Sequence, residues 1–129
     1  MKYYICLLCL ISSLFLAGCK SGSDDKTDTE LCYEKGLAAV YDITENGNAT
    51  SKANTHYERS ALTASHHNLP YNTRIKVTNL NNGRSVNVTI NDHNMPEDEQ
   101  YVIKLSEKAA KEIAYNEGQE VSIDIITWG

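Results

Sequence analysis

Residues 85–98, with the sequence SVNVTINDHNMPED, bring an aspartate and a histidine to the point where an alternating strand runs into a loop. The apolar residues of the alternation are Val86, Val88 and Ile90, and Asp92 falls in the same phase. Side chains of a strand alternate between its two faces, so Asp92 is predicted to point toward the core side at the strand's end. Partial desolvation there would raise the pKa of its carboxyl and favour acid–base chemistry. Alternatively, the strand ends earlier and Asp92 caps the loop through an Asx turn.

Histidines occur at positions 56, 66, 67 and 93, which raises the question of a metal site. Adjacent residues of a strand point in opposite directions, so His66 and His67 rarely share an ion. The sequence has no HxxxH, HxH or cysteine-rich spacing, and we predict neither a metal ion nor another cofactor. Instead, one histidine of the pair is expected to face a groove as a hydrogen-bond donor, and the other to be solvated. A metal-dependent hydrolase that uses His66, His93 and Asp92 has only composition in its favour.

Tyrosines are a further group of candidate binding residues. An aromatic ring can stack on a sugar ring, although in a small barrel such rings usually fill the core. Both roles remain open for four of them: Tyr41, Tyr57, Tyr71 and Tyr101.

Several short strands and one helix are predicted to position these side chains. An Asn-Gly step between two alternating runs, at residues 81–84, predicts a β-hairpin. A helix is predicted over residues 105–114, with Ser106 as its N-cap. The other expected elements are a strand at 36–42, a long loop at 43–56 and a last strand at 119–129. The segment with the sequence SALTA, at 60–64, follows the loop. The domain is therefore predicted to be mostly β, with five or six strands and one short helix, and a small barrel would hide so many strand edges.

The N-terminus indicates export. Lys2 precedes an apolar run that is too short to span a bilayer, and residues 16–19, Leu-Ala-Gly-Cys, resemble a bacterial lipobox. We predict a lipoprotein signal peptide at residues 1–18, then a lipidated Cys19 and flexible tether at 19–35, and one domain at 36–129. An ordinary signal peptide or an uncleaved anchor is the alternative. Lys20 after the cysteine favours the outer membrane, with the domain facing the periplasm.

Composition limits the function classes. The chain of 129 residues is long enough for one domain, and its net charge of -5 gives no sign of nucleic-acid binding. If Cys6 and Cys9 leave with the signal and Cys19 is acylated, Cys32 is predicted to be an unpaired thiol.

Four segments stand out in order along the chain: GLAAVYD, SALTASHHNLPYNTRIKVTNLNNGRSVNVTINDHN, IKLSEKAAKEI and GQEVSIDII. Their order and spacing resemble the double-psi β-barrel domain of the rare lipoprotein A family over residues 36–126. The most specific parts are ALTASH, LPYNTRIKVTNLNNGRSV and INDH. The resemblance implies a six-stranded double-psi β-barrel with a glycan-binding groove.

Family residues can be carried over position by position. The family's histidine falls on His66 and its aspartate on Asp92, which predicts both as catalytic. Its principal acid, a glutamate, falls on Thr55, and Glu58 would be a substitute acid if the loop shifts.

Further departures from the family pattern follow Asp92. His93 takes the place of an arginine, and Lys104 takes the place of an aspartate. A lysine there could pair with Asp92 and lower the pKa of its carboxyl. Together with Thr55 and Tyr57, these two residues are the candidate substrate-binding positions.

The resemblance implies an enzyme that acts on peptidoglycan glycan strands. Such lytic transglycosylases cleave the MurNAc–GlcNAc bond and leave a 1,6-anhydro end, which needs a proton donor and a base but no external water. The alternative is a non-catalytic barrel that binds wall glycan or an envelope protein, because the family's principal acid is replaced at Thr55.

Overall fold

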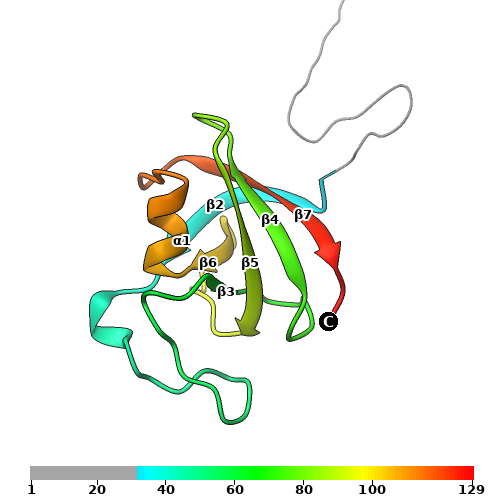
Figure 1. Ribbon diagram of the computed structural model, residues 1–129. Coiled ribbons are helices and arrows are strands. Elements are labelled where there is room, and N and C mark those ends of the chain that lie inside the picture. Colours follow the sequence, from blue (N-terminus) through cyan, green and yellow to red (C-terminus); the bar gives the residue numbers. More distant parts are fainter. Residues whose placement is uncertain (1–31) are drawn as a thin grey trace, which may run out of the picture.

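Six strands form the frame of the protein in the computed structural model, which describes residues 32–129 (Figure 1). The predicted signal peptide, Cys19 and residues 20–31 lie outside the described residues. The elements in chain order are β2 (Glu34–Val40), a 3-10 turn (Ile43–Glu45), β3 (Thr63–Ser65), β4 (Arg74–Asn79), β5 (Ser85–Asp92), β6 (Tyr101–Leu105), α1 (Glu107–Glu112) and β7 (Glu120–Thr127).

The strands close into a barrel in the order β2-β6-β3-β5-β4-β7. β2 pairs with β6 and β3 pairs with β5 in parallel, whereas the other neighbours are antiparallel. Closure removes the exposed edges of an open sheet. The predicted mostly β, six-stranded barrel with one short helix is confirmed, and so is the β4–β5 hairpin.

The region around β6 and α1 corrects the sequence interpretation. Tyr101–Leu105, which no local pattern had marked as a strand, forms β6 between β2 and β3. Leu105 therefore ends a strand and does not begin the helix, which starts at Glu107. Ser106 is the N-cap as predicted, and its hydroxyl accepts a hydrogen bond from the backbone N–H of Ala109.

The core lies inside the barrel, and the alternation of β5 shows how it is built. Val86, Val88 and Ile90 are buried while their neighbours in sequence are exposed or half-buried. Full burial of one such side chain contributes roughly 1.5–3 kcal/mol. Asp92 continues the buried phase, which confirms that it points toward the core side of the strand.

The first strand begins before the predicted domain boundary. β2 includes Glu34 and Lys35, two residues that the sequence analysis placed in the tether. In the full-length chain Cys32 is disulfide-bonded, which differs from the unpaired thiol predicted for the mature protein. That prediction assumed that the other cysteines were removed or acylated. Within residues 32–129, no helix is long and apolar enough to cross a membrane.

Candidate functional site

Asp92 ends β5 with its carboxylate enclosed by hydrogen-bond donors. The residue is only 2% exposed. Oδ2 accepts a hydrogen bond of 2.6 Å from the hydroxyl of Tyr41. Oδ1 accepts from the backbone N–H and the hydroxyl of Ser51, both at 2.9 Å, and from the backbone N–H groups of His93 and Asn94. Both predicted roles of Asp92 thus coexist: it lies on the core side of the strand and it caps the following loop.

These hydrogen bonds decide the charge of Asp92. Burial disfavours its ionised form, but hydrogen bonds from Tyr41, Ser51 and Asn94 outweigh burial, and the pKa of Asp92 is lowered from its ordinary value. Desolvation thus acts in the predicted direction, but the hydrogen bonds reverse the net shift of this pKa. A carboxylate with a lowered pKa stays ionised at neutral pH, so it has no proton to donate, and it is a weaker base than an ordinary aspartate.

Tyr41 is the donor to Oδ2 and is itself tightly packed. Burial and the neighbouring Asp92 charge raise the pKa of the Tyr41 hydroxyl far above its ordinary value, so it remains a donor. Its ring stacks on that of Tyr57 with centroids 4.0 Å apart. Tyr57 is buried, and its hydroxyl accepts a hydrogen bond from the backbone N–H of Glu107. Tyr57, a predicted substrate-binding residue, therefore lies beneath the site and supports Tyr41.

Lys104 lies on the outer side of the same ring. Its Nζ is 4.3 Å from the ring centroid of Tyr41 and 2.8 Å from Oε1 of Glu45. The pairing with Asp92 considered from the sequence is thus replaced by an ion pair with Glu45. Lys104 is not among the principal groups that shift the pKa of Asp92.

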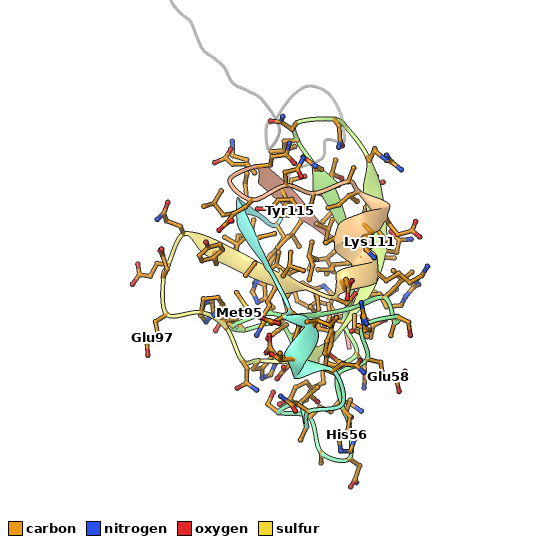
Figure 2. The ribbon with its side chains drawn as sticks, turned by 90° about the vertical axis from the view of Figure 1, so that its left-hand side faces the viewer. His56, Glu58, Met95, Glu97, Lys111 and Tyr115 are labelled. Carbon is orange, nitrogen blue, oxygen red and sulfur yellow. The ribbon has the colours of Figure 1, made fainter. Side chains whose placement is uncertain are left out.

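The long loop before β3 folds back on itself. An isolated bridge joins Ala49 to His56, and the hydroxyl of Thr55 donates to the carbonyl oxygen of Ala53. Thr55 therefore turns its side chain to its own loop. Glu58 is exposed, and Figure 2 shows it with His56 at the outer margin of the loop, apart from Met95, which follows β5. Within residues 32–129, Glu58 is not among the hydrogen-bond partners of the Asp92 carboxylate.

His66 is fixed in a different direction from Asp92. The residue is 2% exposed, and its Nδ1 accepts hydrogen bonds from the backbone N–H groups of Asn68 and Leu69. Nε2 must then carry the ring proton, and it lies 2.7 Å from Oε1 of Glu34 on β2. His67 is exposed, as predicted for one member of the pair, and His66 is a buried donor directed at Glu34.

A chain of hydrogen bonds joins His66 to Asp92. The backbone N–H of His66 donates to the carbonyl oxygen of Asp92 at 3.1 Å. His93 donates from Nε2 to the carbonyl oxygen of Leu69, whose own N–H donates to His66. The ring of His93 also stacks on Tyr71, with centroids 4.2 Å apart. Two family-matched positions and the candidate His93 therefore belong to one connected arrangement.

Sequence reasoning missed two members of this arrangement. Ser51 lies in a polar loop whose composition gives no sign that it would reach Asp92, and Glu34 was assigned to the tether. Only a prediction of the pairing between β2 and its neighbours could have found Glu34. Within residues 32–129, no group of three or more His, Cys, Asp or Glu side chains could hold a metal ion.

The closed six-stranded barrel of parallel and antiparallel strands, with an aspartate at the end of β5, places the protein among the small β-barrel proteins. Comparisons with known proteins identify its family. Residues 33–125 match the family model described as lytic transglycolase. The chain belongs to this family, and its barrel is an RlpA-like double-psi β-barrel domain.

Three relatives illustrate the similarity. The chain is 46% identical over 78 residues to an endolytic peptidoglycan transglycosylase RlpA of Campylobacter jejuni, covering 60% of this chain and 28% of the relative. It is 41% identical over 93 residues to a probable enzyme of that name from Synechocystis, covering 70% and 28%. For the Escherichia coli O157:H7 protein the identity is 38% over 99 residues, covering 77% and 27%. The chain thus spans little more than a quarter of the length of these relatives.

Proposed function

We propose that this domain is a lytic transglycosylase of peptidoglycan glycan strands. The observation that carries the proposal is the ionised carboxylate of Asp92, held by fixed donors at the end of β5, in a chain of the lytic transglycolase family. Preorganised charged groups are what a reaction through an oxocarbenium-like state requires.

In this reaction the C6 hydroxyl of a MurNAc unit attacks its own C1, and the bond from C1 to the GlcNAc oxygen breaks. A base takes the proton from the C6 hydroxyl, and an acid protonates the leaving oxygen. Asp92 serves as the base because its carboxylate is ionised at neutral pH and its donors fix the position of its oxygens. Its Oδ2 accepts only from Tyr41 among residues 32–129, whereas Oδ1 is enclosed by several donors. The proton of the leaving oxygen must come from another group.

A second function, glycan binding without cleavage, has its own support. Asp92 is only 2% exposed, Thr55 bonds to its own loop, and Glu58 lies at the outer margin of the molecule. A barrel with this arrangement can present a groove to glycan without supplying an acid to the glycosidic oxygen. Binding of an envelope protein belongs to the same non-catalytic class.

Mass spectrometry of digested glycan strands separates the two functions. Purified protein is incubated with strands stripped of stem peptides, and we expect fragments with 1,6-anhydro ends. Asp92→Asn is expected to lower their yield at least about 100-fold, the lower range for loss of a general base. Asp98→Asn, an exposed carboxylate outside the site, is the matched control. Intact strands that nevertheless bind the protein would favour the non-catalytic barrel.

The location proposed for the domain follows from the N-terminus. We propose that Cys19 is acylated and that it anchors the protein in the outer membrane, facing the periplasm. Two or more acyl chains, at about 0.8 kcal/mol per buried methylene, are sufficient for stable anchoring. Labelled palmitate should appear in the wild-type protein and be absent from Cys19→Ala, which should fractionate away from the membrane. Incorporation of label into Cys19→Ala would refute the anchor.

A further inference from the structure

Two exposed aromatic rings lie beside the Glu34–His66 pair. Tyr33 is 45% exposed and Trp128 is 60% exposed. Their rings meet edge to face with centroids 6.0 Å apart, and the Tyr33 ring is 6.1 Å from that of His66. We call these four residues, Tyr33, Glu34, His66 and Trp128, the aromatic patch. Tyr33 precedes β2 and Glu34 begins it, whereas His66 follows β3 and Trp128 follows β7.

The carboxylate of the aromatic patch, that of Glu34, is held in place by a hydrogen bond from the buried His66. His66 is buried, and backbone N–H groups fix its ring by donating to Nδ1, so Nε2 can only donate. The acceptor is Oε1 of Glu34, at 2.7 Å. Glu34 keeps 38% of its side chain exposed, and its Oε2 accepts no hydrogen bond within residues 32–129. An oriented acceptor therefore faces solvent next to two apolar rings.

This combination matches the chemistry of a pyranose ring. A sugar presents an apolar face of C–H groups, which packs on aromatic rings, and a rim of hydroxyl and amide donors, which a carboxylate accepts. Specific sites for small ligands likewise pair apolar walls with a few placed polar groups. The charge of Glu34 disfavours a sugar that carries a free carboxylate, such as MurNAc, and favours neutral N-acetylglucosamine.

The aromatic patch is also rigidly joined to Asp92. The backbone N–H of His66 bonds to the carbonyl oxygen of Asp92, and Leu69 links the rings of His66 and His93. A linear polymer bound at Asp92 could therefore continue onto a neighbouring subsite without rearrangement of the barrel.

We propose that the aromatic patch is a glycan subsite that binds a neutral N-acetylglucosamine unit. The inference rests on the proposed function, in that it names a second contact for the same strand. It does not require cleavage, so it can fail or succeed independently of the transglycosylase reaction.

Intrinsic fluorescence tests the subsite directly, because Trp128 is the one tryptophan of the sequence. The full-length protein is titrated with chitotetraose, an oligomer of N-acetylglucosamine that contains no MurNAc. We expect a saturable change in the emission of Trp128. Tyr33→Ala and Glu34→Gln keep the reporter, and each should weaken binding about threefold to tenfold, the range expected for one aromatic or polar contact.

Lys35→Gln is the matched control, because it changes the charge of the adjacent, exposed residue of β2. It should bind as the wild type does. Calorimetry of Trp128→Ala gives a readout that is independent of fluorescence, and melting temperatures verify that each variant folds. Chitotetraose that leaves Trp128 emission unchanged would overturn the subsite, as would equal affinities for wild type, Tyr33→Ala and Trp128→Ala. Anhydro products formed despite such a result would leave the proposed reaction intact.

Discussion

Single residues at the end of β5 combine structural and chemical roles. Asp92 anchors the preceding loop through Ser51, and the same hydrogen bonds keep its carboxylate ionised. Tyr41 is central because its hydroxyl donates to Oδ2 of Asp92 while Lys104 lies over the face of its ring. The acid–base properties of Asp92 are therefore set by its donors and not by the lysine.

Tyr41→Phe removes the shortest of these hydrogen bonds and keeps the ring. We expect the pKa of Asp92 to rise, and the free energy of unfolding at neutral pH to fall by about 1.5–3 kcal/mol, as for a hydrogen bond to a charged group. An NMR titration of the Asp92 carboxyl carbon and urea denaturation measure the two effects. Tyr33→Phe, on the aromatic patch, is the control and should change neither. An unchanged pKa of Asp92 in Tyr41→Phe would contradict the role given to Tyr41.

Two contacts, one in the loop between β2 and β3 and one between β2 and β6, can each be tested by a single substitution. The loop between β2 and β3 is fastened at Ser51, and β2 approaches β6 closely at Gly36. The first contact orders a segment beside the site, and the second concerns closure of the barrel.

Ser51→Ala should loosen the loop more than the barrel. The substitution removes the hydroxyl that donates to Asp92 and accepts from Tyr71, but keeps the backbone N–H bond to Asp92. We expect faster amide hydrogen exchange at Thr50 and Tyr57, whose N–H groups bond within the loop, and little change in β4. Uniform loss of protection across β4 and the loop would show that the two do not open separately.

Gly36→Ala should strain the pairing of β2 with β6. A Cβ at this position would lie 2.6 Å from Cγ1 of Val102 and 3.1 Å from the carbonyl oxygen of Gln100. We expect a loss of about 1–3 kcal/mol in the free energy of unfolding, the usual cost of overpacking. In a Val102→Ala background the added cost of Gly36→Ala should fall below about 1 kcal/mol, because the clashing methyl is gone. Equal costs in both backgrounds would show that Val102 is not the obstacle.

At the scale of the whole molecule, two carboxylates with lowered pKa values make the free energy of unfolding depend on pH. The pKa of Glu107 is lowered to about 2 by hydrogen bonds from Arg59 and then Lys111, and that of Asp92 is lowered as well. A depressed folded-state pKa stabilises the protein above the unfolded value, and the stabilisation is lost as pH falls through the folded value. The stabilisation due to Glu107 therefore begins to be lost below about pH 4.5, the ordinary pKa of its carboxyl.

Thermal melts between neutral pH and pH 2 should therefore show a steady fall in melting temperature below about pH 4.5. Arg59→Gln should flatten the part of this fall due to Glu107, because the partner that lowers its pKa is lost. Lys108→Gln is a suitable control, since Lys108 pairs with Glu112 and not with Glu107. An identical pH profile for Arg59→Gln and wild type would rule out this contribution.

Much of the fold could be predicted because it depends on local patterns. The alternation in β5, the Asn-Gly turn before it and the Ser106 cap all appeared at the expected residues. β6 could not be found in this way, since Tyr101–Leu105 has no clear alternation: Val102 and Ile103 are adjacent and both buried. It becomes a strand because β2 and β3 flank it in the closed barrel.

The sequence by itself determined that Asp92 faces the core side, since a period of two assigns each residue of a strand to a face. Only the tertiary structure decided what Asp92 meets. Its donors Tyr41 and Ser51 lie 51 and 41 residues away in sequence, and Glu34 meets His66 across 32 residues. Barrel closure brings such distant residues together. Because the pKa of a buried carboxylate depends on those partners, its ionisation state was beyond the reach of the sequence pattern.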